Sequence, residues 1–184
     1  MGNDDNIHWY PMRVTYGREL RVKAFLDEIA VENFLPVKQV ITQRGGHRQF
    51  EKVPAVNNLI FLRSTQPDIT LIKNEYGELE PLRYIMRHAL DPNTPRLPLI
   101  VPNKDMDNFM RVAVHEDDSV MFVDPMELDG KAGQRVMITQ GEFTGVEGII
   151  TRVRRNKRVV VQLCNLAAVA ITFTPPVYLK LLDG

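Results

Sequence analysis

The sequence predicts an α+β domain followed by a small β-barrel, and three observations lead to this fold class. Up to about residue 115, strand-like and helix-like segments alternate, as in an antiparallel sheet flanked by helices. From Lys131 on, only short alternating apolar segments follow, which is typical of a small barrel. The charge also divides: residues 1–130 carry 15 lysines and arginines against 20 aspartates and glutamates, a net charge of −5, and residues 131–184 carry 8 against 3, a net charge of +5.

The first part is predicted to run strand, helix, hairpin, strand, helix, strand, helix. Bulky alternating residues predict a strand over 8–16, and apolar residues spaced by three and four predict an amphipathic helix over 18–33. The pair Gly45-Gly46 is a strong hairpin signal between a strand over 34–43 and a return over 50–54. The later elements are a buried strand over 57–64, a short helix within 65–78 with Thr65 or Asp68 near its start, a strand over 82–89, an extended proline-rich stretch over 93–102 and a helix over 103–116 with Asn103 as its cap.

The second part is predicted to hold short strands only. Residues 117–130 show no strong periodicity and are expected to form a linker, and the strands follow within 134–141, 148–155, 158–165, 168–175 and 177–182.

Four glycines stand among the alternating apolar residues of 133–150. β-branched, alternating residues follow Gly148, so they predict a strand and not the helix that a phosphate-binding loop requires. We therefore expect the glycines at bends and strand ends that need positive φ or close backbone approach, with Val136 and Ile138 facing inward.

Composition excludes several classes of protein. The hydrophobic fraction of 44% and charged fraction of 25% are those of an ordinary globular protein. No apolar run approaches the roughly 20 residues of a membrane span, and the acidic, polar N-terminus is no secretory signal, so we expect a cytoplasmic protein without membrane contact. Cys164 is the only cysteine and is expected to pack as a small hydrophobe.

The chain offers no recognisable catalytic or metal-binding pattern. The four histidines lie far apart, no ligand pair has metal spacing, and neither a nucleophile elbow nor a glycine-rich loop before a helix is present in the sequence. We therefore expect no enzyme activity, no cofactor and no metal.

The glycine pattern of residues 133–150 resembles the KOW motif, in which a glycine and alternating apolar residues precede G-x-F-x-G-x-x-G and a strand. The matching residues are Gly133, Val136, Ile138, Gly141, Phe143, Gly145, Gly148, Ile149 and Ile150. The motif builds SH3-like barrels in transcription elongation factors and in some ribosomal proteins. The resemblance therefore implies an SH3-like barrel over 131–184.

The first part of the chain resembles the NusG family of transcription elongation factors. Residues 8–28 are similar to the family's opening strand and first helix, 53–63 to its Pro-Gly-Tyr-Val-Phe-Val strand, and 98–110 to its later proline-rich strand and last helix. The resemblance implies an N-terminal NusG domain over 1–116, a linker over 117–130 and a KOW domain over 131–184. Leu59 at the family's tyrosine position and Leu166 near an exposed aromatic position indicate a specialised paralogue, similar to RfaH-type and capsule-operon antiterminators of bacteria.

This resemblance implies a function and a partner. Members bind RNA polymerase at the clamp helices of its largest subunit and suppress pausing or termination, and a specialised paralogue would do so on specific operons, such as those for polysaccharide. Binding a coiled coil needs an exposed apolar surface on the sheet. The polymerase-binding candidates are Tyr10, Leu59, Phe61, Tyr84 and Ile100, while Trp9 and Met86 are assigned to the core.

Two further surfaces follow from the same resemblance. Elements that face the upstream DNA and the non-template strand in the family carry an aromatic residue and cations, which suit bases and phosphates: Tyr16, Arg18, Arg21, Lys23, Arg44, His47 and Arg48. The KOW domain of relatives recruits the termination factor Rho or a small ribosomal protein, and the candidates by position are Phe143, Val146 and Leu166. The basic run 151–158 is a candidate for RNA contact. We expect a monomer.

Two alternatives stay open. The chain could be a KOW-containing RNA-binding or ribosome-associated protein, although such proteins are usually strongly basic and the isoelectric point here is about 6.9. RfaH itself stores its KOW domain as a helical hairpin, but each interior glycine costs a helix about 1 kcal/mol, so we expect strands here.

Overall fold

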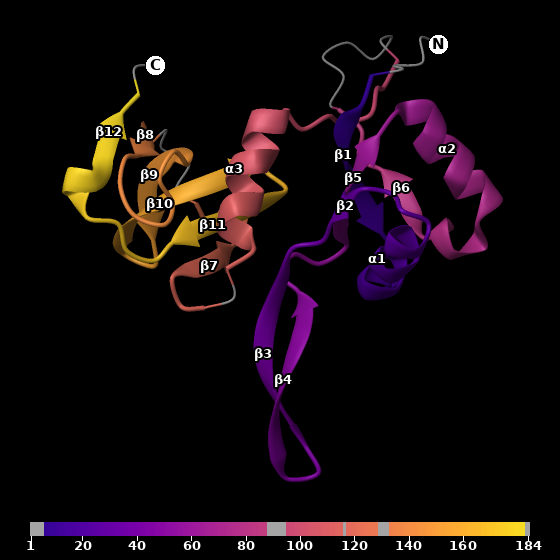
Figure 1. Ribbon diagram of the computed structural model, residues 1–184, viewed down its shortest axis with the longest axis horizontal. Coiled ribbons are helices and arrows are strands. Elements are labelled where there is room, and N and C mark those ends of the chain that lie inside the picture. The colour runs from indigo at the N-terminus through magenta and orange to yellow at the C-terminus, as the bar shows by residue number, and fades with distance from the viewer. Residues whose placement is uncertain (1–5, 88–94, 116, 129–132, 183–184) are drawn as a thin grey trace. The chain divides into compact units, whose positions relative to one another are not determined.

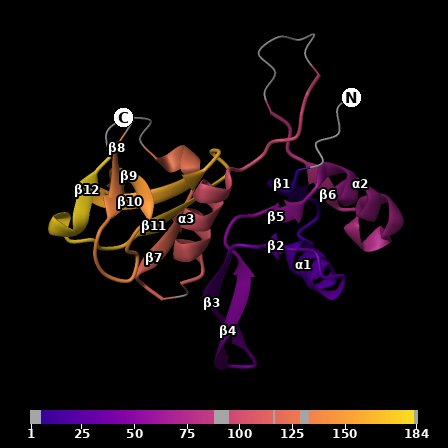
Figure 2. The same ribbon diagram turned by 45° about the horizontal axis from the view of Figure 1, so that its top comes forward.

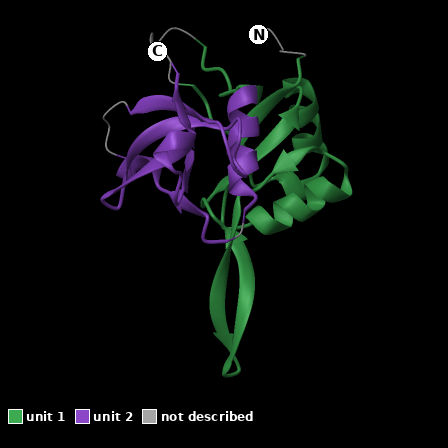
Figure 3. Ribbon diagram, turned by 60° about the vertical axis from the view of Figure 1, so that its left-hand side comes forward, with its two compact units in different colours: residues 1–103 green, residues 104–184 purple. Residues whose placement is uncertain are grey.

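The computed structural model describes residues 6–87, 95–115, 117–128 and 133–182. Contacts divide the chain into two compact units, Met1–Asn103 and Lys104–Gly184 (Figures 1 and 3). Each unit has its own antiparallel sheet. The mixed α/β character and antiparallel sheets expected from the sequence are thus confirmed.

Unit 1 is built on a four-stranded antiparallel sheet in the order β2-β5-β1-β6. The two central strands, β1 and β5, pair along almost their whole length. The elements are β1 His8–Val14, α1 Glu19–Glu28, β2 Asn33–Phe34, β3 Val37–Arg44, β4 His47–Pro54, β5 Leu59–Ser64, α2 Gln66–Glu75, the 3-10 turn η1 Gly77–Leu79 and β6 Leu82–Tyr84. Their order agrees with the expectation from the sequence.

One face of this sheet forms a core with α1 and α2, which lie beside the sheet in Figure 2. Tyr10 lies opposite Leu62 and Met12 opposite Ile60, so these four side chains share the face. They pack with apolar residues of both helices, namely Val22, Leu26 and Ile69. The apolar residues of α1, spaced by three and four, therefore form the face of the helix that packs against this core.

The opposite face of the sheet is also apolar and buried. Leu59 and Phe61 alternate with Ile60 and are 3% and 0% exposed, and Trp9, which bridges to Val101, is 3% exposed. Both faces of β5 are therefore buried, which explains why its first four residues form a continuous apolar run.

Strands β3 and β4 form a separate two-stranded ribbon. Arg44 pairs with His47 across a two-residue turn in which Gly45 and Gly46 have φ of 58° and 82°. Positive φ at both positions defines the primed turn that matches the twist of a hairpin. Figure 1 shows the ribbon extending away from the four-stranded sheet of its unit.

Unit 2 contains a six-stranded antiparallel sheet in the order β12-β8-β9-β10-β11-β7. Its elements are α3 Asn103–Ala113, β7 Val120–Val123, the 3-10 turn η2 Pro125–Glu127, β8 Gln134–Ile138, β9 Glu147–Val153, β10 Asn156–Leu163, β11 Ala167–Ile171, the 3-10 turn η3 Pro176–Tyr178 and β12 Leu179–Leu181. Strands, and not a helical hairpin, therefore occupy the C-terminal part. Closure of this sheet into an SH3-like barrel stays a prediction.

Three features of unit 2 differ from the sequence expectation. The segment expected to be a linker contains β7, because the apolar run Val120–Val123 pairs with β11. The helix α3 is grouped with unit 2, apart from its first residue. Cys164 is exposed, with a φ of 45°, because it lies in the turn between β10 and β11 and not in a strand.

The glycines of 133–150 occupy the two kinds of position predicted for them. Gly141 and Gly145 have φ of 87° and 85°. A Cβ on Gly148 would lie 2.7 Å from the carbonyl oxygen of Val160, and one on Gly133 would lie 2.1 Å from that of Ile150. Two glycines therefore serve turns, and two allow neighbouring backbone to approach closely.

Gly148→Ala should destabilise unit 2, because the added methyl group meets backbone atoms of β10 that cannot turn away. We expect the free energy of unfolding to fall by about 1–3 kcal/mol. Gly77→Ala is the matched control, since no atom lies within 4 Å of its Cβ position. Urea unfolding followed by circular dichroism measures both, and equal stabilities of the two variants would contradict the close-packing assignment.

Candidate functional site

An exposed aromatic side chain stands in the turn between β1 and α1. Tyr16 is 82% exposed and has a φ of 65°. This left-handed conformation is unusual for a bulky residue, and it costs free energy that surrounding contacts must offset. A strained, solvent-exposed tyrosine indicates a role outside the core.

Neighbouring elements of unit 1 hold this turn from both ends. The backbone N–H of Val14 donates to the carbonyl of Asn58 at 3.1 Å, and that of Thr15 donates to the carbonyl of Pro81 at 3.1 Å. On the helix side, Oε1 of Glu19 accepts from the backbone N–H of Asn58 at 2.7 Å. Glu19 is only 4% exposed, and its place in the first turn of α1 suits a carboxylate. The start of β5 thus fixes the start of α1.

Two arginines accompany the tyrosine. The guanidinium carbon of Arg18 lies 5.5 Å from the centroid of the Tyr16 ring, which is within cation–π range. Arg18 and Arg21 also line a small depression of about 110 Å³, together with Gly77 and Glu78. An aromatic face beside cations can stack a base and attract its phosphates. The structure thus brings Tyr16, Arg18 and Arg21 together as predicted.

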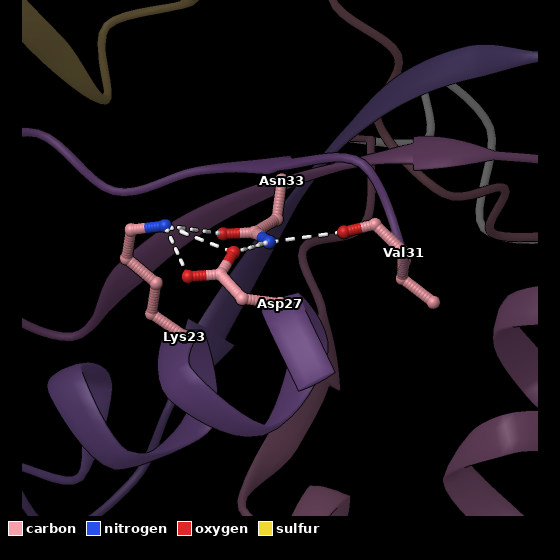
Figure 4. Close-up of polar contacts among 4 residues, drawn as sticks. All are labelled: Lys23, Asp27, Val31 and Asn33. Atoms are coloured by element: carbon pink, nitrogen blue, oxygen red, sulfur yellow. Dashed lines mark hydrogen bonds and ion pairs between the residues drawn. The ribbon is translucent and has the colours of Figure 1, made fainter. Parts of the chain in front are cut away.

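Lys23 takes a different role from these arginines. Its Nζ donates to both carboxylate oxygens of Asp27, at 3.0 and 2.8 Å, and the amide of Asn33 donates to Asp27 at 2.8 Å and to the carbonyl of Val31 at 3.0 Å (Figure 4). The hydrogen bond from Lys23 lowers the pKa of Asp27. This network ties the end of α1 to β2, so the charge of Lys23 is already compensated within the fold.

The remaining nucleic-acid candidates lie at the tip of the β3–β4 ribbon. Arg44 and His47 flank the two-glycine turn, and Arg48 follows on β4. All three are exposed. The seven predicted residues therefore form two groups on separate elements, one at the start of α1 and one at the ribbon tip, with Lys23 held apart by its own contacts.

The five polymerase-binding candidates divide between the two faces of the sheet. Tyr10 and Tyr84 pack edge to face with ring centroids 6.0 Å apart, and both belong with Ile100 to the α1/α2 face. Leu59 and Phe61 lie on the opposite face. Tyr10, Leu59 and Phe61 are buried, so they do not form the exposed surface that the sequence led us to expect.

Tyr84 and Ile100 are half-buried. The residues just after Tyr84 form backbone hydrogen bonds with the residues just before Ile100. The backbone N–H of Arg87 donates to the carbonyl oxygen of Leu97, and an antiparallel β-bridge joins Met86 to Pro98 beside it. Met86 is 40% exposed, so its assignment to the core was wrong, whereas that of Trp9 is confirmed. Met86 lies two residues after Tyr84, beyond the end of β6.

The hydroxyl of Tyr84 is engaged with α2. It donates to the carbonyl of Gln66 at 3.2 Å and lies 3.2 Å from the hydroxyl of Thr70. Burial raises the pKa of Tyr84, and Nζ of Lys73 lies 4.9 Å from its ring centroid. The hydroxyl of Tyr84 therefore serves the fold.

In unit 2, α3 contacts the glycine-rich loop that carries the predicted partner residues. The guanidinium of Arg111 donates to the carbonyl of Thr144 at 2.6 Å, and the side chain of Asn108 accepts from the backbone N–H of Glu147 at 3.2 Å. The ring of Phe143 packs edge to face on His115, with centroids 4.9 Å apart. The loop is thus held by residues on one side of α3 and just beyond its end.

The three KOW partner candidates differ in their accessibility. Val146 is fully buried, so it belongs to the core, because its place after the Gly145 turn directs it inward. Phe143 and Leu166 are half-buried. Sequence reasoning missed Phe173 and Val177, both 78% exposed in the loop after β11, and it missed Ile41 and Phe50 on the ribbon. An apolar residue within a polar ribbon or beside consecutive prolines was the available signal.

Among the described residues, no helix is long and apolar enough to cross a membrane. The same residues hold no group of three or more side chains arranged to bind a metal ion.

The family model described as transcription termination factor NusG matches residues 7–110. This is more than half of the chain, and the chain belongs to the NusG family. NusG-family proteins are transcription elongation and termination factors. A search of curated proteins found no match.

Asp27→Asn should weaken the network at the end of α1 in a pH-dependent way. Since the hydrogen bond from Lys23 holds the pKa of Asp27 below its usual value in the folded chain, the carboxylate adds stability above that usual value and loses the contribution as pH falls through the folded pKa. Both partners are at least a third exposed, so we expect a loss of only about 0.5 kcal/mol near neutral pH.

Urea unfolding at neutral pH and at about pH 3 measures this difference. Glu28→Gln, a neighbouring exposed carboxylate on α1, is the control. A stability gap for Asp27→Asn that stays as large in acid would argue against the ion-pair origin.

Tyr16→Asn separates strain from function. Asn tolerates left-handed φ better than Tyr does, so the stability of the variant should stay within about 0.5 kcal/mol of the wild type or rise. Affinity for single-stranded nucleic acid should fall on the order of tenfold, because a stacking ring is lost. Thermal unfolding and fluorescence anisotropy measure the two effects. A variant that is markedly less stable but binds normally would show that Tyr16 serves the fold instead.

Proposed function

We propose that this protein is a specialised NusG-family elongation factor that binds RNA polymerase and suppresses pausing or termination on specific operons. The observation that carries the proposal is the family match over residues 7–110, which spans the sheet, the ribbon and both helices of unit 1. The sites of contact are the clamp helices of the largest polymerase subunit, as the resemblance implies. Leu59 at the family's tyrosine position supports the specialised assignment.

The proposed polymerase surface lies at the β6 edge of unit 1. Tyr84 and Ile100 are half-buried there, and the exposed Met86 follows two residues after Tyr84. An apolar strip that is partly held by the core is suited to accept the tip of a coiled coil, because it is preformed and desolvation of its side chains favours binding. Tyr10 supports the strip from beneath through its edge-to-face contact with Tyr84.

The proposed DNA surface is the turn at the start of α1. Tyr16 supplies a stacking face, and Arg18 and Arg21 supply positive charge for phosphates of the upstream duplex or the non-template strand. The ribbon-tip residues Arg44 and His47 extend the positive charge to a second point of contact.

Unit 2 is proposed to recruit a partner through its KOW motif. Phe143 and Leu166 keep partly accessible side chains, and Phe173 and Val177 add exposed apolar area. A surface of this kind suits a protein partner, and the relatives' partners, Rho or a small ribosomal protein, are the candidates.

We also propose the domain division 1–116, 117–130 and 131–184 as the division inherited from the family, with the connecting segment 117–130 contributing β7 to the sheet of unit 2. It differs from the contact-based division between Asn103 and Lys104, since the family match continues through most of α3 to residue 110.

Met86→Asp should weaken binding of the full chain to a reconstituted RNA polymerase elongation complex. A carboxylate on the proposed strip would be desolvated in the complex, which should lower affinity by at least about tenfold. Leu71→Asp is the matched control, because Leu71 is an exposed apolar residue of α2, outside the strip.

Native gel shift or biolayer interferometry with the elongation complex measures the affinities, after circular dichroism has verified that both variants fold. Equal binding by Met86→Asp and Leu71→Asp would move the polymerase site away from the β6 edge. Failure of the wild type to bind would remove the proposed function.

A further inference from the structure

A cavity of about 310 Å³ opens in unit 2, at the place where β9 and β10 separate. The two strands pair only as far as Ile149 and Val160. Beyond this point β9 continues beside β8 through Gly148, while β10 stays with β11. The helix α3 lies against the same sheet (Figures 1 and 3) and lines the cavity through Asp105 and Asn108. The volume is at the lower end of the range for ligand cavities, so it suits a molecule of metabolite size.

The lining of the cavity is apolar where it is buried and polar where it is exposed. Val160 and Val161 are buried. Asp105, Arg135 and Cys164 are exposed at the edge. Such a lining favours a ligand with a hydrocarbon part, which leaves water on binding, and with polar groups that the edge can orient.

One buried side chain in the lining has hydrogen-bonding capacity that the fold does not use. Asn108 is 8% exposed, and its side-chain oxygen accepts from the backbone N–H of Glu147 at 3.2 Å. Its side-chain nitrogen has no hydrogen-bond partner among the residues that the structure describes. Buried N–H groups without an acceptor cost free energy. A ligand that brings an acceptor oxygen would therefore be favoured at Asn108.

A cation stands beside these amide donors, on β8. A guanidinium nitrogen of Arg135 lies 3.5 Å from Oε2 of Glu147, whose Oε1 is bound by Nζ of Lys104 at 2.7 Å. Since a guanidinium carries five N–H donors, Arg135 keeps donors for a further acceptor. This side of the cavity therefore suits a carboxylate.

An anion stands on another side, near the turn between β10 and β11. Burial raises the pKa of the Cys164 thiol, and the negative charge of Asp105 raises it further, so the carboxylate lies close to that turn. The position of Asp105 in the first turn of α3 suits a negative charge. Among the described residues, Asp105 has neither an ion pair nor a hydrogen bond. A ligand cation would therefore be attracted to it.

We propose that this cavity binds a small zwitterion of the amino-acid class with an aliphatic side chain. The ammonium group of the ligand pairs with Asp105, and its carboxylate accepts from Asn108 and Arg135. Its hydrocarbon part packs on Val160 and Val161. A simple amine would leave the donors of Asn108 and Arg135 unused, and a simple carboxylate would leave Asp105 without a cation.

L-leucine is the probe, and it is tested on the full chain. Cys164 is the only cysteine and lines the cavity, so the rate of its alkylation by iodoacetamide reports occupancy. L-leucine should slow this alkylation in a saturable way below about 10 mM. It should also raise the thermal stability of the chain, because it binds only the folded state.

Two analogues of L-leucine test the two charged groups separately. 3-Methylbutylamine lacks the carboxylate, and 4-methylpentanoate lacks the ammonium group. Each should bind at least about tenfold more weakly than L-leucine, because charged hydrogen-bonding groups of the cavity stay unmatched.

Asp105→Asn should weaken binding of L-leucine on the order of tenfold, because a charge-assisted hydrogen bond is lost. Without ligand, Cys164 of this variant should be alkylated faster than in the wild type, since the charge that opposes the thiolate is gone. Asp107→Asn is the matched control, because Asp107 is an exposed aspartate of the same helix that lies outside the cavity lining. It should bind L-leucine as the wild type does, and circular dichroism verifies that both variants fold.

Three results would overturn the proposed ligand site. The first is unchanged alkylation of the wild type in L-leucine up to about 10 mM. The second is protection by 3-methylbutylamine equal to that by L-leucine, and the third is wild-type affinity in folded Asp105→Asn. The proposed polymerase function is independent of all three, because its surface on unit 1 shares no residue with the cavity.

Discussion

The antiparallel pairing of β1 with β5 is the constraint on which the rest of unit 1 depends. It places one apolar face toward α1 and α2, and the first four residues of β5 are buried on both faces of the sheet. Every connection around it is then fixed in place. The backbone of Asn58, just before β5, holds both ends of the Tyr16 turn, and the bond from Ala55 to the carbonyl of Pro36, at 2.8 Å, closes the base of the ribbon. Backbone groups of Ala55 and Asn58, which immediately precede β5, therefore hold both the ribbon and the Tyr16 turn in place.

The residues proposed to bind partners are those whose side chains do not pack in the core. The turn that holds Tyr16 in a left-handed conformation is anchored by the buried Val14 on one side and the buried Glu19 on the other, which allows an exposed ring to keep a fixed position. Arg18 stands beside this ring, so a neutral chain presents local positive charge where a strand of nucleic acid would lie. Met86, just after β6, is an exposed apolar side chain and suits a protein partner instead.

Local patterns in the sequence were sufficient to predict most helices and strands, because turns and helix caps depend on residues that are close together in the chain. The hairpin follows from Gly45-Gly46, and the start of α2 follows from Thr65, whose hydroxyl accepts from the backbone N–H of Asp68 at 3.2 Å. The candidate site was predicted only in part. Arg18 and Lys23 are both cations of the same segment, but Lys23 is neutralised by Asp27 four residues later in α1, a spacing that can be read from the sequence. Only the bond from Asn33 to Asp27 depends on where β2 lies. Likewise, the alternation of Leu59 and Phe61 predicted a shared face, but not that this face is buried. The burial of Leu59 and Phe61 depends on packing between residues far apart in the chain, which a single sequence does not reveal.

Cross-linking mass spectrometry of the full chain bound to an RNA polymerase elongation complex tests the central claim most directly. A photoreactive residue in place of Met86 should form cross-links to the clamp helices of the largest subunit, while one in place of Leu71 should not. Cross-links from both positions to scattered sites, or from Met86 to a ribosomal or RNA component alone, would contradict a polymerase-binding NusG domain and favour the reading of the chain as an RNA-binding KOW protein.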